Sequence, residues 1–225
     1  MSNSPLAVYT QISPNKSSPR NKPIDTITIH CMAGNLSVES CGNMFAPSSR
    51  QASSNYGIGS DGRIALYVDE KDRSWCTSSA ANDNRAVTIE VANSEAKHPW
   101  PVTDKALAAL IDLCTDICKR NGIKQLVWRP DKNNPGNMTV HRWYANKACP
   151  GDYLYERHGY IAAEVNKRLS KTPEEITVDN AIADGIITER THWLGVLTGT
   201  ITPNKAYIKA VLDNAHNKIK KQGAL

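Results

Sequence analysis

The order of apolar patterns along the chain predicts an α/β domain followed by a small all-α unit. Two segments with strand-like alternation lie at 24–31 and 85–92, with a hairpin pattern between them, and amphipathic helix patterns follow. The last fifty or so residues contain only helix-sized segments. With 225 residues, 40% of them hydrophobic and 22% charged, the chain can build one sizeable core and a small second unit.

Residues 2–23 are rich in Ser, Asn, Pro and Lys and contain no apolar run. We therefore expect no signal peptide and no membrane-spanning segment, and a chain that is made and folded in a cytoplasm. The strand that follows alternates, so that Ile27 and Ile29 share an apolar face and His30 points to the polar face. A lone histidine at such a position can be structural or functional.

A helix capped by Ser37 is predicted through residue 46. The dipeptide Asp61-Gly62 between two short apolar runs then predicts a hairpin with a two-residue primed turn. Tyr56 begins the first strand of this hairpin, where a strand-edge aromatic is the plain interpretation.

Glu90 lies in the middle of the apolar strand pattern RAVTIEVA. A carboxylate there is costly to bury unless it is paired or faces a site, and a solvated strand face is the alternative. After this strand we predict a helix that starts at Thr103 and ends before Gly122, a short strand at 125–128, a turn-rich loop at 131–138 and a helix at 151–169.

The segment HRWYANKACP, residues 141–150, holds His141, Lys147 and Cys149 within nine positions. Imidazole and thiolate are ligands that Zn²⁺ prefers, and the lysine places a cation close to such a metal. A catalytic zinc site usually takes three protein ligands, so a third must come from elsewhere in the chain.

The six cysteines are expected to be free thiols or metal ligands, because a reducing compartment disfavours disulfides. Cys114 and Cys118 sit four residues apart in a helix pattern and read as small core residues. The net charge of +5 suits a negatively charged polymer, either nucleic acid or a bacterial wall. The basic residues are scattered and no nucleic-acid recognition motif accompanies them.

Residues 170–176 are predicted to be a linker, and 177–225 a small helical domain with helices at 178–187, 190–197 and 204–220. The range 170–225 carries 7 basic and 6 acidic residues. The near-neutral balance is poorly suited to phosphate contacts, so nucleic acid is not expected as a partner. At about 50 residues this domain is only marginally stable alone.

Several separated motifs together resemble the type 2 N-acetylmuramoyl-L-alanine amidases, a family that includes many phage endolysins and is related to peptidoglycan recognition proteins. The motifs are TITIHC, NYGIGSDGRI, NRAVTIEVAN and the segment ending KACP, and the resemblance covers residues 22–169. It implies a central mixed sheet flanked by helices. Residues 1–169 are then a catalytic domain.

The resemblance also implies one zinc ion held by His30, His141 and Cys149. Lys147 matches the lysine that stabilises the oxyanion, and Glu90 matches the glutamate that serves as general base in some members. Tyr56 matches the tyrosine that other members use close to the zinc-activated water. Trp75, in RSWCTSS, either lines the substrate groove or packs in the core.

From this resemblance we expect hydrolysis of the amide between N-acetylmuramic acid and L-alanine in peptidoglycan, by a phage or prophage endolysin that reaches the wall after release by a holin. Residues 177–225 are then a wall-binding domain, with a helical cap on the catalytic domain or a DNA-binding unit as alternatives. A peptidoglycan-binding module without turnover and a zinc-dependent stem-peptide peptidase are the alternative functions. We expect a monomer.

Overall fold

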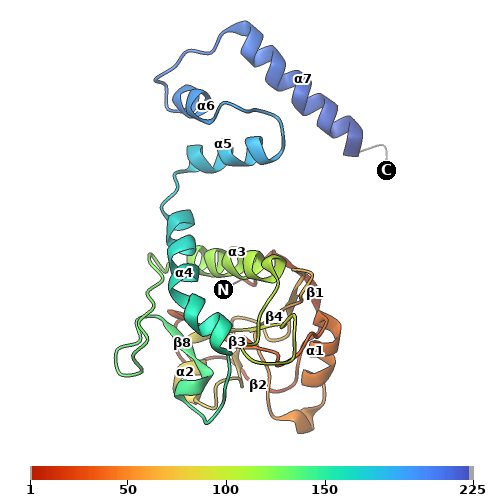
Figure 1. Cartoon of the computed structure of the whole chain (residues 1–225), viewed down its shortest axis with the longest axis vertical. Helices are drawn as coiled ribbons and strands as arrows, with labels where there is room; N and C mark the ends of the chain where they lie inside the picture. The colour runs from red at the N-terminus through yellow and green to blue at the C-terminus, as the bar shows by residue number, and fades with distance from the viewer. Residues whose placement is uncertain (1, 223–225) are drawn as a thin grey trace. The chain divides into compact units, whose positions relative to one another are not determined.

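A six-stranded mixed sheet forms the centre of residues 1–169 in the computed structural model, which describes residues 2–222 (Figure 1). The strand order is β1-β5-β4-β7-β3-β8, in which only the β4–β5 pair is antiparallel. The strands are β1 (Ala7–Thr10), β3 (Thr26–Cys31), β4 (Tyr56–Ile58), β5 (Ile64–Leu66), β7 (Ala86–Val91) and β8 (Met138–Val140). The expected central mixed sheet is thereby confirmed.

The two central strands β3 and β7 alternate β-branched residues with polar ones, and they pair in parallel along their whole length. Ile29 lies opposite Ile89 and His30 lies opposite Glu90. Since side chains alternate between the two faces of a strand, the isoleucines point to one face and His30 and Glu90 point together to the other.

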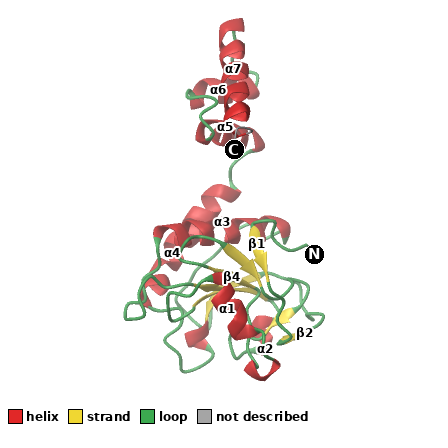
Figure 2. Ribbon diagram, turned by 90° about the vertical axis from the view of Figure 1, so that its right-hand side faces the viewer, coloured by secondary structure: helices red, strands yellow, loops and turns green. Residues whose placement is uncertain are grey.

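Helices cover both faces of this sheet (Figure 2). The helices α3 (Asp104–Arg120) and α4 (Asp152–Leu169) pack on the apolar face and form the main core together with the strands. On the other face, α1 (Val38–Phe45) packs against the end of β5, and a short α2 (Ala80–Asp83) lies beside β7. Ser37 caps α1 and Thr103 caps α3, as predicted, through side-chain oxygens that accept backbone N–H groups.

The polar face of the sheet is buried, and its hydroxyl groups are paired. Thr28 and Thr139 hydrogen-bond across β3 and β8 at 2.7 Å, and Asn82 of α2 donates to Thr28 at 3.0 Å. Ser74 and Thr88 are joined in the same way at 2.7 Å. These pairs satisfy the hydrogen-bonding groups of the buried hydroxyls on the face that also carries His30 and Glu90.

The polar N-terminal segment, in which the sequence predicts no strand, is part of the folded domain. It contributes β1, which extends the sheet beside β5, and β2 (Lys16–Ser17), which pairs with β6 (Arg73–Ser74) in a separate two-stranded sheet. The prediction missed both because their stability comes from ladder hydrogen bonds to distant strands and not from a local apolar pattern.

Two further predictions of local structure are wrong. The hairpin turn has a three-residue loop, closed by Gly59 N–H to Arg63 O and Gly62 N–H to Gly59 O, both at 2.9 Å. Within this loop only Gly62 has a positive φ, at 88°. A two-residue primed turn requires a positive φ at its first central residue, which would be Asp61 here. The predicted strand at 125–128 is a single bridge between Trp128 and Gly136, and the strand that reaches the sheet is β8.

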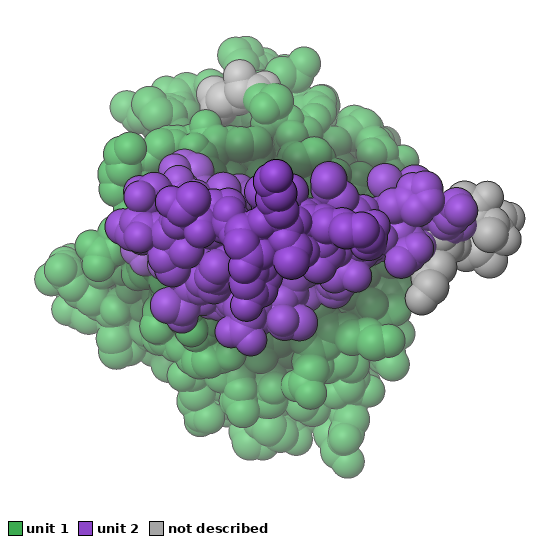
Figure 3. All heavy atoms as spheres, turned by 90° about the horizontal axis from the view of Figure 1, so that it is seen from above, with its two compact units in different colours: residues 1–169 green, residues 170–225 purple. Residues whose placement is uncertain are grey.

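Residues Ser170–Leu225 form a second unit, coloured separately in Figure 3. Its helices are α5 (Pro173–Ala183), α6 (Arg190–Leu197) and α7 (Lys205–Gln222). The predicted linker at 170–176 is therefore wrong in its second half. Thr172 and Glu175 form a reciprocal capping box, and α5 starts at Pro173, five residues before the predicted start at 178. Among residues 2–222, no helix is both long and apolar enough to cross a membrane.

Candidate active site

Three candidate residues meet where parallel strands end. His30 is the fifth residue of β3, Glu90 is the fifth residue of β7, and His141 directly follows β8 as the first residue of a short 3₁₀ helix (His141–Trp143). The carboxyl ends of parallel strands lie at one edge of a sheet, which is where ligands bind in open α/β sheets. The fold therefore gathers residues that are 111 positions apart in sequence.

His30, His141 and Cys149 place their ligand atoms within 4.8 Å of one another. The Cys149 Sγ lies 3.3 Å from His30 Nδ1, and the two imidazole ring centroids are 5.1 Å apart. His30 is fully buried, whereas His141 and Cys149 are partly exposed. The cluster is thus buried on the side of His30 and accessible to solvent on the side of His141 and Cys149.

Arg142 holds the loop that carries Cys149. Its backbone N–H donates to the Cys149 carbonyl at 3.1 Å, and its guanidinium donates to the Ala148 carbonyl at 2.6 Å and to Asp152 at 3.0 Å. These bonds fold residues 142–152 back over the end of β3. We call this set of Arg142 hydrogen bonds the Arg142 clamp. It could not be predicted from the spacing of the histidines or from the KACP motif, because it depends on how the loop folds.

The donor set fits a zinc ion. Two imidazoles and a thiol are a zinc ligand combination, and three protein ligands leave a coordination position for substrate chemistry. His30 Nε2 and His141 Nε2 are buried without a hydrogen-bond partner among the described residues. Burial lowers the pKa of His30 well below its usual value, helped by His141, and burial also lowers the pKa of His141. Both rings are therefore neutral, as metal binding requires.

The Cys149 thiol lies beside a second thiol. A hydrogen bond with Cys31, followed by burial, raises the pKa of Cys149 well above its usual value. A bound metal would reverse this, because a coordinating thiol is deprotonated. All six cysteines are free, and Cys114 and Cys118 are buried in α3 as the sequence suggested.

Glu90 points toward the cluster from β7. Its Oε1 lies 3.9 Å from His30 Nδ1 and accepts a long hydrogen bond, also 3.9 Å, from the Cys76 thiol, while Oε2 has no partner among residues 2–222. His30, Cys76 and Glu90 form a second set of donor atoms within 4.8 Å, which shares His30 with the first. Burial, and secondarily Cys31, raises the pKa of Glu90 well above its usual value. The solvated alternative for this carboxylate is therefore wrong.

Lys147 is exposed and stands between two cavities that also share His141. The larger, of about 560 Å³, is lined by Arg50, Arg73 and Trp75 among others. The smaller, of about 250 Å³, reaches Glu90 and Cys149. Both cavities therefore reach His141 of the donor cluster, and Lys147 lines each of them.

The wall of the larger cavity includes Trp75, for which the sequence left two positions open, and two arginines that the sequence did not single out. Trp75 lies there and not in the core, and Ser17 of β2 accepts hydrogen bonds from Trp75 Nε1 at 3.0 Å and from Arg73 Nη2 at 2.7 Å. Arg50 ends a 3₁₀ helix (Ser48–Arg50) on the same cavity. The position of Arg73, two residues before Trp75, was the only sequence feature that could have suggested its place in this wall. Ser17 could not be foreseen, because β2 was not predicted.

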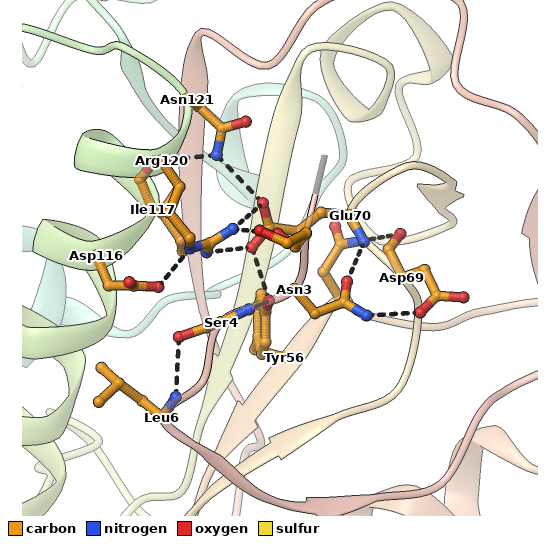
Figure 4. Close-up of polar contacts among 12 residues, drawn as sticks. Asn3, Ser4, Leu6, Tyr56, Asp69, Glu70, Asp116, Ile117, Arg120 and Asn121 are labelled. Carbon is orange, nitrogen blue, oxygen red and sulfur yellow. Dashed lines mark hydrogen bonds and ion pairs between the residues drawn. The ribbon is translucent and has the colours of Figure 1, made fainter.

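Tyr56 does not join the cluster. The predicted role of Tyr56 close to zinc is therefore wrong. Its ring is fully buried in the main core. Its hydroxyl donates to Glu70 Oε1 at 2.6 Å and accepts the Ser4 N–H at 2.8 Å (Figure 4). In the pleat Tyr56 pairs with Ile89, and its neighbour Gly57 pairs with Glu90, so the tyrosine faces away from Glu90. Burial and the Glu70 carboxylate also raise its pKa.

The neighbours of Glu70 show what this tyrosine does. The buried Glu70 carboxylate is held by Arg120, at 2.5 Å and 3.0 Å, and by Asn121 at 3.1 Å, both at the end of α3 (Figure 4). The Glu70 N–H donates to Asn3 Oδ1 at 2.9 Å. Tyr56 is thus part of a network that ties the N-terminal segment and α3 to the sheet.

Comparisons with known proteins agree with this geometry. The family model described as N-acetylmuramoyl-L-alanine amidase matches residues 20–152, which include all three donor residues. None of the curated proteins matches the sequence at a significant level.

Solved structures share the fold. PlyL has a TM-score of 0.54 at 16% identity, with 71% of this chain and 97% of that chain covered. A selenomethionine derivative of AmpD has a TM-score of 0.54 at 17% identity, with 71% and 96% covered. The endolysin amidase LysCS from Clostridium intestinale URNW has a TM-score of 0.50 at 20% identity, with 74% and 99% covered. Because the matched family segment spans more than half of the chain, the protein belongs to the N-acetylmuramoyl-L-alanine amidase family.

Proposed function

We propose that this protein is a zinc-dependent amidase that cuts the bond between the lactyl group of N-acetylmuramic acid and the L-alanine of the stem peptide. The observation that carries the proposal is the cluster of His30, His141 and Cys149 at the strand ends, inside the segment that matches the family. His30, His141 and Cys149 would hold the zinc ion, which would supply Lewis-acid polarisation of the scissile carbonyl and of water.

In this proposal Glu90 moves the proton. Its Oε2 is free of hydrogen bonds from the described residues, and burial raises the pKa of this carboxyl group above its usual value. A general base works best when its pKa lies near the working pH. Glu90 takes a proton from the attacking water and returns it to the amine nitrogen of L-alanine as the C–N bond breaks, so the proton count closes over one turnover.

Lys147 is the residue placed to stabilise negative charge on the carbonyl oxygen. It lines both cavities that meet at the donor cluster, and it projects from the same loop as Cys149. A fixed cation at the point where charge develops lowers the barrier, and loss of one such donor typically reduces the rate by about 10²- to 10³-fold. Arg50 and Arg73 extend the positive lining of the larger cavity.

We further propose that the protein acts as a phage or prophage endolysin and works as a monomer. It is made in the host cytoplasm and reaches peptidoglycan after release by a holin. The similarity to LysCS, an endolysin amidase, supports this proposal. The net charge of +5 suits an anionic wall.

Residues 170–225 would target the enzyme to the wall. Support comes from the separation of this unit from residues 1–169, each with its own internal contacts. Its nearly neutral charge balance favours an uncharged component of the wall over a polyanion.

Analysis of digested peptidoglycan tests the proposal. Purified walls should release new L-alanine amino termini without new reducing sugars, and removal of zinc by a chelator should abolish the release. New reducing ends alone would show a glycosidase and contradict the proposal. Mass spectrometry of the soluble products separates an amidase, which frees intact stem peptides, from a peptidase, which frees fragments of them.

A further inference from the structure

An aromatic cluster lies in the second unit, and none of its residues belongs to the amidase site. His192 and Trp193 of α6 meet Tyr207 of α7, with ring centroids 4.7 Å apart for His192 and Tyr207 and 6.4 Å apart for Trp193 and Tyr207. Tyr207 is 44% exposed although it packs against two rings. The cluster therefore presents aromatic surface to solvent in place of closing a core.

This surface forms one end of a groove between the 184–189 turn and α7. A cavity of about 160 Å³ is lined by Trp193, Tyr207, Glu189 and Asn214 among others. A neighbouring cavity of about 350 Å³ is lined by Asp184, Gly185, Asn214, Asn217 and Lys218. Asn214 lines both cavities, so the aromatic cavity and the polar cavity adjoin at this residue, and the pair is called the groove here. Their sizes together suit a small ligand, for which sites of roughly 300–1,000 Å³ are usual.

The polar end is pre-ordered by contacts within the unit. Asn214 Nδ2 donates to the Ile186 carbonyl at 2.8 Å, which fixes the amide plane and leaves its Oδ1 without a donor among the described residues. Lys218 forms an ion pair with Asp184, so these opposite charges cancel at the rim. The groove thus offers amide groups and no net positive charge.

These features select the class of ligand. Teichoic acids and nucleic acids are polyanions and require unpaired cations, which this groove lacks. Trp and Tyr rings with an apolar body bind the flat apolar face of a sugar ring, and amide groups bind hydroxyl and acetamido groups around its edge. A neutral amphipathic sugar matches both ends of the groove.

We propose that the groove lined by Trp193, Tyr207, Asn214 and Asn217 binds an N-acetylated sugar of the glycan strand of peptidoglycan. The inference rests on the proposed wall-targeting function of residues 170–225. It places recognition of the sugar backbone in the second unit, whereas the amidase site acts where the stem peptide joins that backbone.

Binding of the full-length chain to purified walls tests the assignment, in a Cys149→Ala background that leaves the wall uncut. Tyr207→Ala should weaken binding at least 10-fold, and Asn217→Ala, at an exposed position outside any core, should weaken it about 3-fold. Tyr160→Ala is the matched control, since Tyr160 is 53% exposed on α4 and outside the groove, and it should bind like the parent. Circular dichroism confirms that helix content is kept.

Soluble competitors then identify the ligand. Glycan strands stripped of peptide should displace the protein from walls, and free stem peptides should not. If stem peptides compete and glycan strands do not, wall targeting stands and the sugar assignment is overturned. If Tyr207→Ala and Asn217→Ala both bind like the parent, the groove is not the site. Failure of the parent to bind walls at all would contradict the targeting function itself.

Discussion

Replacement of Tyr56 by phenylalanine separates the structural role seen here from a catalytic one. The Tyr56 hydroxyl makes two hydrogen bonds, one to the buried Glu70 carboxylate at 2.6 Å and one from the Ser4 N–H at 2.8 Å. Phenylalanine fills the same space, so no cavity forms. The variant loses the two bonds and leaves the ring packing intact.

The expected cost follows from the kinds of bond that are lost. A hydrogen bond to a charged group contributes about 1.5–3 kcal/mol and a neutral one about 0.5–1.5 kcal/mol. Glu70 keeps Arg120 and Asn121 as partners, which limits the loss. We expect the free energy of unfolding to fall by about 2–3 kcal/mol. With an m-value of about 2 kcal/mol/M, the urea midpoint would fall by about 1 M.

Activity on peptidoglycan should change less than about 2-fold under conditions where the variant is folded, because Tyr56 faces the core and not the donor cluster. Tyr67→Phe is a matched control, since Tyr67 is equally buried but donates only one hydrogen bond, to the Val38 carbonyl at 2.6 Å. Its destabilisation should be the smaller of the two. A Tyr56→Phe enzyme with an unchanged urea midpoint and a hundredfold lower kcat would refute this reasoning.

Three further predictions concern the site and the core. Cys149→Ala should lose zinc, measured by atomic absorption, and lose activity, while binding to walls survives; retained stoichiometric zinc would show that Cys149 is not a ligand. Lys147→Ala should keep zinc and lower kcat by about 10²- to 10³-fold with KM little changed, and a loss expressed only in KM would argue against an oxyanion role. His158 is buried beside Trp128, and burial lowers its pKa to about 4 from 6.5. Because the unfolded chain takes up this proton first, the contribution of His158 to stability is full above pH 6.5 and falls by about 3 kcal/mol as the pH drops to about 4. Urea titrations at pH 7 and pH 4.5 should show this loss in the parent and a flatter profile in His158→Leu; identical profiles would rule out the histidine as its source.

The parts of the fold that were predicted from sequence are those with strong local signals. The alternation in β3 and β7 comes from β-branched residues on one face, and Ser37 and Thr103 cap helices whose apolar stripes are clear. Such patterns reflect burial of one face and hold wherever the segment packs. The N-terminal strands β1 and β2 lack that pattern. They are held by pairing with β5 and β6, which lie more than fifty residues away in the sequence, so no local signal predicts them.

The start of α5 and the hairpin loop show a second limit. Thr172 and Glu175 carry a capping-box signature, yet the surrounding Ser, Lys and Pro also suit a linker. In the hairpin, Gly62 supports either a primed turn or a longer loop with a single left-handed residue. Local propensity allows both solutions in each case, and the packing of the neighbouring elements selects one.

For the site, the residue types and motifs were enough to predict a chemistry, whereas the folded chain shows which of the predicted residues lie together. Two histidines, a cysteine, a lysine and a strand carboxylate in family motifs were enough to predict a zinc amidase. Only the folded chain shows that His30 meets Cys149 across 119 positions, that the Arg142 clamp brings this about, and that Tyr56 is turned away. The reason is the pleat: a shift of one residue along a strand moves a side chain to the opposite face, and only the paired strands settle which face holds the site.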